Sequence, residues 1–239
     1  MSHEPLALLD ASFYPQCWDE RCATDALALL HALLQGNVTA SAEDIAARLL
    51  EDSAYREWIY FSVFGRYLQR SFDAFYRQSE DSFNSEMPDL FRAELMRHAR
   101  PLAMQQQLFM AGMLPEHTRS EKLLTATVNP ATAIRRAALS SQPVINHITI
   151  TGKNVAAFPI RHNRRTSERI RNEVLILDFH SLRLVSENMM TQAPVTVDNK
   201  PASAGFWQRW LAPKPEANEP KTSSSALPLH YCIRHYELR

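Results

Sequence analysis

Apolar residues in the first half of the chain recur at the spacing of amphipathic helices. A first helix is predicted from Asp19 to Gln35, and Gly36 stands where a helix end favours glycine. Ser41 and Asp44 form a capping-box pattern that opens a second helix, from Ala42 to Glu51. These patterns predict a helical front half.

A third helix is predicted from Ser53 to Gln78, where large apolar side chains step by three and four residues. We interpret this stripe as packed core rather than as a cofactor site. Its members are Trp58, Phe61, Phe64, Leu68, Phe72 and Phe75.

Two further helical stretches are marked by prolines. The stretch from Asp89 to Met113 contains Pro101, which lacks a backbone N–H, so we expect two helices that meet near Arg100. Asn129 and Pro130 are an N-cap and N1 pair that opens a helix ending near Ser141. A short helical pattern over residues 120–127 precedes that pair.

The period then changes to the alternation of strands. Val144 to Ile150 is β-branched, Gly152-Lys153-Asn154 offers a turn, and Val155 to Ile160 could return as the second strand of a hairpin. Pro159 indicates that this second strand lies at an edge. Further strands are predicted over residues 173–179 and 229–238.

The order of elements predicts an α+β protein with a helical N-terminal part and a small, strand-containing C-terminal part. We divide the chain into residues 1–116, an acidic helical region, and 117–190, a basic helix-hairpin region. Residues 191–227 are rich in proline and serine, which predicts a flexible segment, and residues 228–239 form the closing strand.

Composition places the 239-residue chain among globular proteins, because 45% of its residues are apolar and 22% are charged. Cys17, Cys22 and Cys232 do not form a disulfide framework, which favours a reducing compartment. The N-terminus does not read as a secretory signal and no run of about 18 apolar residues occurs. We therefore expect a cytoplasmic protein.

The formal net charge of zero hides an uneven distribution. Residues 1–116 hold 17 acidic and 9 basic residues, whereas residues 117–185 hold 4 acidic and 11 basic residues. Such asymmetry is typical of a surface that meets a polyanion, and it could equally draw the two halves of one molecule together.

The basic charge concentrates in residues 161–171, between two predicted strands. Guanidinium groups fork onto phosphate or carboxylate oxygens, so a loop of this kind predicts contact with nucleic acid or with an acidic protein surface. The expected contact residues are Arg161, Arg164, Arg165, Arg169 and Arg171, with Arg135, Arg136 and Lys153 nearby in the predicted fold.

The elements over residues 102–171 follow the order of a winged helix: a short helix, a turn, a capped helix with Arg135 and Arg136, and a hairpin. This order resembles the winged-helix class. The resemblance implies that the capped helix enters the major groove of DNA while the basic hairpin contacts phosphates.

The spacing of Arg92 and His98 resembles that of the arginine and histidine in the HEPN ribonucleases, a helical family. The resemblance implies metal-independent RNA cleavage with both residues at a dimer cleft. The alternative interpretation is a surface arginine and a histidine near a helix C-terminus, where a positive charge is favoured.

Other catalytic and cofactor classes find little support. The five scattered glycines exclude a P-loop and a dinucleotide-binding fingerprint, so no cofactor is expected. His230, Cys232 and His235 lie close together, but a closed zinc site needs four ligands, so no metal is predicted.

One aromatic island interrupts the flexible segment. Two tryptophans beside leucine in a polar tail are typical of a short docking segment, which binds either its own domain or another protein. Its residues are Phe206, Trp207, Trp210 and Leu211.

These features together predict a non-catalytic accessory or adaptor subunit that contacts nucleic acid or a nucleoprotein through the basic loop. The enzymatic alternative is a ribonuclease that uses Arg92 and His98. The third hypothesis is a subunit that interacts only with proteins.

Overall fold

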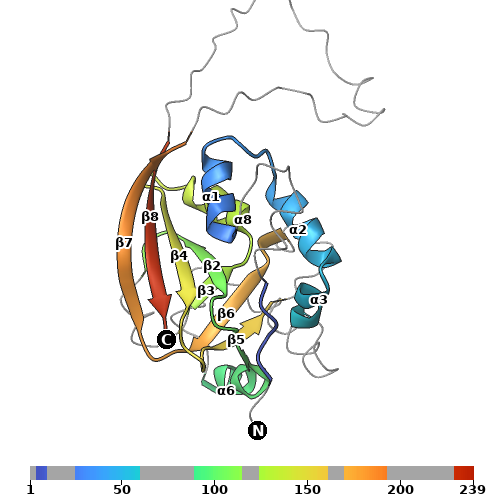
Figure 1. The fold of residues 1–239 in the computed structure, drawn as a ribbon. Coiled ribbons are helices and arrows are strands. Elements are labelled where there is room, and N and C mark those ends of the chain that lie inside the picture. Colours follow the sequence, from blue (N-terminus) through green and yellow to red (C-terminus); the bar gives the residue numbers. More distant parts are fainter. Residues whose placement is uncertain (1–3, 10–24, 60–88, 115–123, 161–169, 193–228) are drawn as a thin grey trace, which may run out of the picture.

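The computed structural model describes residues 4–9, 25–59, 89–114, 124–160, 170–192 and 229–239 (Figure 1). Its strands are β1 (Arg100–Pro101), β2 (Gln107–Ala111), β3 (Leu124–Thr127), β4 (Val144–Ile150), β5 (Ala156–Pro159), β6 (Glu173–Asp178), β7 (Leu182–Thr191) and β8 (His230–Leu238). They form one 8-stranded sheet in the order β1-β5-β6-β3-β2-β4-β8-β7. Only β4 and β8 pair in parallel among these neighbours, so the sheet is mixed.

Helices lie beside this sheet, which confirms the α+β class (Figure 1). The described helices are α1 (Ala26–Leu34), α2 (Ala42–Glu51), α3 (Ser53–Ile59), α6 (Asp89–His98) and α8 (Pro130–Ala137). Figure 1 shows α1, α8, α2 and α3 on one side of the sheet and α6 near β5. The winged-helix arrangement is not confirmed, because β4 and β5 do not pair as its hairpin. Residues 115–123 and 161–169 lie outside the described residues.

The helix-capping residues predicted from the sequence cap helices in the structure. Ser41 and Asp44 form a reciprocal capping box at the start of α2. Asn129 caps α8 by accepting from the backbone N–H of Thr132, and Pro130 follows it. Gly36 adopts a φ of 71°, as the predicted helix-ending glycine should.

The helix expected after Pro101 is wrong. Residues 107–111 form β2, which pairs with β3 on one side and with β4 on the other. Leu108 and Phe109 are both fully buried, so each face of this strand meets other protein atoms. A short apolar run that is buried on both faces carries no helical or alternating period, so its sequence cannot separate helix from strand. The described part of the short pattern over residues 120–127 is likewise a strand, β3.

The hairpin expected between residues 144–150 and 155–160 is also wrong, although both strands form. β4 pairs with β2 and β8, whereas β5 pairs with β1 and β6. Pro159 pairs with Val174 of β6, and the two-residue β1 pairs only with Ala156 and Ala157. Because β1 does not extend to Pro159, the missing backbone N–H of this proline costs no hydrogen bond to β1.

The predicted closing strand is confirmed as β8, which lies between β4 and β7. β7 is a strand that the sequence reading missed, because nearly all its side chains are exposed and polar residues interrupt its apolar ones. It pairs with β8 along its whole length, and a bulge lies between Leu184 and Ser186.

One continuous hydrophobic core joins the helices to the sheet. It includes Leu30 of α1, Trp58 of α3, Phe109 of β2 and Ile233 of β8, all of them fully buried. The burial of Trp58 confirms the described part of the aromatic stripe as core, while the other members of that stripe lie outside the described residues. None of the described helices is long and apolar enough to cross a membrane.

Candidate functional site

The structure describes both ends of the arginine-rich segment. The backbone N–H of Ile160 donates to the carbonyl of Glu173 (2.8 Å), which closes a loop between β5 and β6. Arg161, Arg164, Arg165 and Arg169 lie outside the described residues. Ile170, Arg171 and Asn172 are described and lead into β6.

The side chains of α8 hold the returning end of this loop. The side-chain amide of Asn129 donates to the carbonyl of Ala42 (2.9 Å), to that of Ile170 (3.2 Å) and to the side-chain oxygen of Asn172 (3.0 Å). The Thr132 hydroxyl also donates to the carbonyl of Ile170 (3.0 Å). The same capping residue that starts α8 therefore connects α2 and the loop end.

A second set of buried contacts continues this network toward α3. The Thr127 hydroxyl donates to the carbonyl of Arg171, and the Asn172 amide donates to the Tyr55 hydroxyl (3.0 Å). Asn172 adopts a φ of 47°, a left-handed conformation that asparagine tolerates better than most residues. Burial raises the pKa of Tyr55 to about 12, so this hydroxyl stays neutral and keeps its proton. We call Tyr55, Thr127, Asn129, Thr132 and Asn172 the loop anchor.

Arg135 and Arg136 are adjacent on α8 but have different surroundings. Arg136 lies 2.9 Å from the carboxylate of Glu173, whose side chain is only 1% exposed, while that of Arg136 is 40% exposed. Arg135 is 67% exposed and pairs with the exposed Glu43 at 3.4 Å, an ion pair that water screens. Arg135 therefore remains accessible to a ligand, whereas Arg136 neutralises a buried carboxylate of its own chain.

Among the described residues, Lys153 lies by the end of β5 that pairs with Asp178, whereas Arg171 leads into the opposite end of β6. Lys153 occupies the turn before β5, and Ala156 of β5 pairs with Asp178 at the far end of β6. The arginine-rich segment joins the opposite ends of these two strands. Strand register, which the sequence does not display, therefore places Lys153 and Arg171 near opposite ends of β6.

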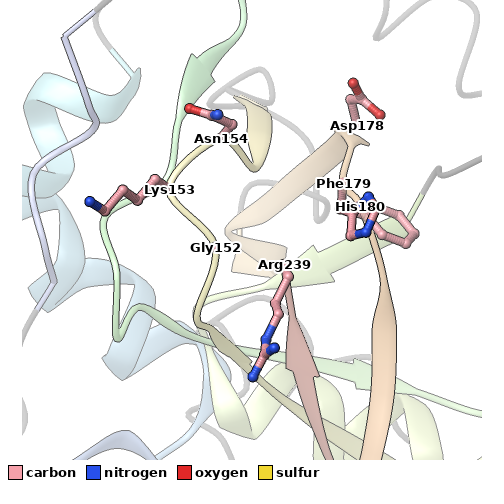
Figure 2. A pocket seen from close by; sticks show the side chains of 7 residues that line it. All are labelled: Gly152, Lys153, Asn154, Asp178, Phe179, His180 and Arg239. Carbon is pink, nitrogen blue, oxygen red and sulfur yellow. The ribbon is translucent and has the colours of Figure 1, made fainter.

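Lys153 instead lines a pocket of about 400 Å³ (Figure 2). The pocket is formed by two turns and the residue after β8, and its lining residues are Gly152, Lys153, Asn154, Asp178, Phe179, His180 and Arg239. A Cβ atom on Gly152 would lie 2.6 Å from the Arg239 backbone, so the close approach of these segments requires glycine. In Figure 2 the charged groups of Lys153, Asp178 and Arg239 point in different directions and do not converge on one ligand position.

A histidine pair beneath α1 was not found from the sequence. His147 of β4 and His235 of β8 are cross-strand partners, and their Nδ1 atoms lie 3.1 Å apart. Burial and the neighbouring His235 lower the pKa of His147 to about 4, and burial also lowers the pKa of His235. Both rings are therefore neutral near pH 7. Only the pairing of β4 with β8 reveals this contact.

The hydrogen bonds fix the protons of this pair. Gln107 Oε1 accepts from the Leu27 N–H (3.1 Å) and lies 3.2 Å from Nε2 of His147, which must therefore carry a hydrogen. Nδ1 of His147 then accepts from Nδ1 of His235, whose Nε2 accepts from the Asn188 amide (3.4 Å). This directed chain runs from exposed β7 to the buried side of α1.

Metal-binding residues do not gather in the part of the chain that the structure describes. No group of three or more histidine, cysteine, aspartate or glutamate side chains there could hold a metal ion. His230 lies near the Thr191 hydroxyl (3.0 Å), whereas His235 contacts His147.

Arg92 and His98 both lie on α6 and have contacts within the chain. The Arg92 guanidinium donates to the carbonyl of Leu177 in β6 (2.9 Å), and His98 lies 3.9 Å from the carboxylate of Glu94. Arg92 thus ties α6 to the sheet, and cleavage of RNA by these residues stays an untested prediction.

The fold and contacts define an α+β protein in which hydrogen bonds hold both described ends of the arginine-rich segment. No family model matches the sequence, and no curated protein or solved structure gives a match. The predicted docking residues, Phe206, Trp207, Trp210 and Leu211, lie outside the described residues.

Proposed function

We propose that this protein is a non-catalytic accessory subunit that contacts nucleic acid, or a nucleoprotein, through residues 161–171 and Arg135. The observation that carries the proposal is the loop anchor. It fixes Ile170 and Arg171 against the helix that displays Arg135. A loop held at its base loses less entropy on binding than a free tail does.

The charge of this region suits a phosphate backbone. Residues 161–171 contain five arginines and one glutamate, Glu168, and Arg135 adds another positive charge beside the loop base. Arginine forks match phosphate oxygens in a bidentate manner, and each neutralised phosphate releases a counterion. Arg136 is left out of the proposed contact set because it neutralises Glu173.

The experiment replaces Arg164 and Arg165 by alanine in the full chain and follows binding to labelled RNA and DNA by fluorescence anisotropy. The slope of log K against log salt should fall in magnitude by about 1.8 on duplex DNA or about 1.4 on single strands, as expected for two lost phosphate contacts. Affinity at low salt should fall for all sequences alike, because phosphate contacts carry no base preference.

The matched control replaces Arg56 and Arg97, two exposed arginines of the acidic region, by alanine. This control removes the same charge and should leave the salt slope unchanged. Equal effects of the two double variants, or salt-independent binding by the unmodified protein, would contradict contact through the loop. The same samples show on a gel whether RNA is cut without metal.

A further inference from the structure

The last strand of the sheet, β7, exposes apolar side chains that nothing in the described structure covers. Met189 is 68% exposed and Leu184 is 49% exposed, and Met113, which follows β2, is 62% exposed. We call Met113, Leu184 and Met189 the β7 patch. Exposed clusters of large apolar side chains at a sheet edge mark interaction surfaces.

Contacts place these three residues on one face of the sheet. Arg234 of β8 lies 2.6 Å from the carboxylate of Glu187, and another nitrogen of the same guanidinium lies 3.2 Å from the Met113 sulfur. Met189 is two residues beyond Glu187, so it points to the same face. Leu184 pairs with Tyr236, two residues beyond Arg234 and again on this face.

We propose that the β7 patch is the docking surface for Phe206–Leu211 of the same chain. The apolar residues Phe206, Trp207, Trp210 and Leu211 have the spacing of one helix face, with Gln208 and Arg209 on the other. Amphipathic segments of this kind bind grooves through such anchors. Methionine sulfurs also make favourable contacts with aromatic rings, and two of the three patch residues are methionines.

The geometry of the chain favours this occupant. The N–H of Gln192 donates to the carbonyl of Leu229 (2.8 Å). The chain between these two residues, which contains residues 206–211, therefore leaves and re-enters the sheet at the same end of β7. Phe206 is fourteen positions beyond Gln192, and a random coil of fourteen residues has a root-mean-square span of about 20 Å. Along β7 the distance from Gln192 is roughly 10 Å to Met189 and roughly 26 Å to Leu184.

The chain from Leu211 to Leu229 is also long enough to let residues 206–211 reach the β7 patch. Leu229 is eighteen positions beyond Leu211, and a random coil of eighteen residues has a root-mean-square span of about 23 Å. A tethered segment reaches its highest effective concentration where the linker span matches the distance to the site. The stretches on both sides of residues 206–211 meet this condition at the β7 patch. Docking of these residues on their own chain is therefore favoured over docking on a second copy.

The test measures the rate at which peroxide oxidises individual methionines, by mass spectrometry of the full chain. Met104, which is 45% exposed near the start of β2, is the internal reference. If the segment is docked for about 90% of the time, changing Trp207 and Trp210 to alanine should speed oxidation of Met113 and Met189 about ten-fold relative to Met104. The ratio in the unmodified chain should not depend on protein concentration.

The control variant changes Gln208 and Arg209 to alanine and should leave the oxidation ratios unchanged. A second measurement changes Leu184 and Met189 to aspartate, after which amide hydrogen exchange over residues 206–211 should become faster. Equal oxidation rates with and without the tryptophans would overturn the proposal. Protection that grows with protein concentration would also overturn it, since it would show a second copy as the occupant.

Discussion

At the scale of single residues, neighbouring side chains of the same type have different roles. Arg135 and Arg136 follow one another on α8, yet only Arg136 reaches the buried carboxylate of Glu173. A buried carboxylate that loses this ion pair remains desolvated, so the loss costs more than that of an exposed ion pair.

Changing Arg136 to alanine should therefore lower the free energy of unfolding by about 2 to 3 kcal/mol. Changing Arg135 to alanine should alter it by less than about 0.5 kcal/mol, because its pair with Glu43 is exposed. Urea denaturation of the two variants measures the difference. Equal losses would show that the Arg136–Glu173 pair contributes no more than a surface contact.

At the scale of elements, strand register creates the histidine pair. The parallel pairing of β4 with β8 sets His147 beside His235, and β2 adds Gln107 on the other side. α1 covers this group and brings His31 and Asp25 close enough to influence the charge of His147.

The pair should make stability depend on pH. The pKa of His147 is about 4 in the folded protein and about 6.5 when unfolded, so the unfolded chain binds the proton first as pH falls. Stability should thus decrease between about pH 6.5 and pH 4, by about 3 kcal/mol from His147 alone. Urea denaturation at several pH values measures this decrease.

The variant His147→Gln tests the assignment. Its stability should decline less steeply over the same pH range, because the buried titrating ring is gone. The variant His180→Gln changes an exposed histidine outside the pair and is the matched control. An unchanged decline in His147→Gln would assign the pH dependence to other groups.

At the scale of the whole molecule, described residues of the acidic front half and of the basic back half share one hydrophobic core. β2, from the front half, lies between β3 and β4 in the sheet. Arg135 pairs with Glu43 across the boundary, so part of the charge asymmetry is used within the chain. Residues 161–169 carry much of the remainder.

The sheet should depend on its last strand. β8 buries four large side chains, Tyr231, Ile233, Tyr236 and Leu238. Their burial contributes roughly 6 to 12 kcal/mol, which is comparable to the whole stability of a typical domain. A chain that ends at residue 228 should therefore lose its cooperative thermal unfolding transition, as measured by circular dichroism.

Excision of residues 212–227 is the control for this truncation. It retains β7, β8 and the aromatic residues of the docking segment, and it should keep the cooperative transition. A truncated chain that still unfolds cooperatively would show that β8 is dispensable for the fold.

Features that depend on neighbouring residues could be predicted from the sequence. The capping box of α2, the Asn129 and Pro130 start of α8, and strands β4, β6 and β8 were predicted because local hydrogen bonds and side-chain periodicity specify them. The α+β class follows from this order of elements.

The pairing of strands and the contacts between distant polar groups came from the packing of the folded chain. Because β2 has buried side chains on both faces, its sequence lacks the alternation of a half-buried strand. Because β7 has exposed side chains on both faces, its sequence lacks that alternation too. Strand pairing placed Lys153 and Arg171 near opposite ends of β6 and joined His147 to His235, residues 88 positions apart. Such long-range contacts arise from the packing of the whole chain, so no local pattern in the sequence encodes them.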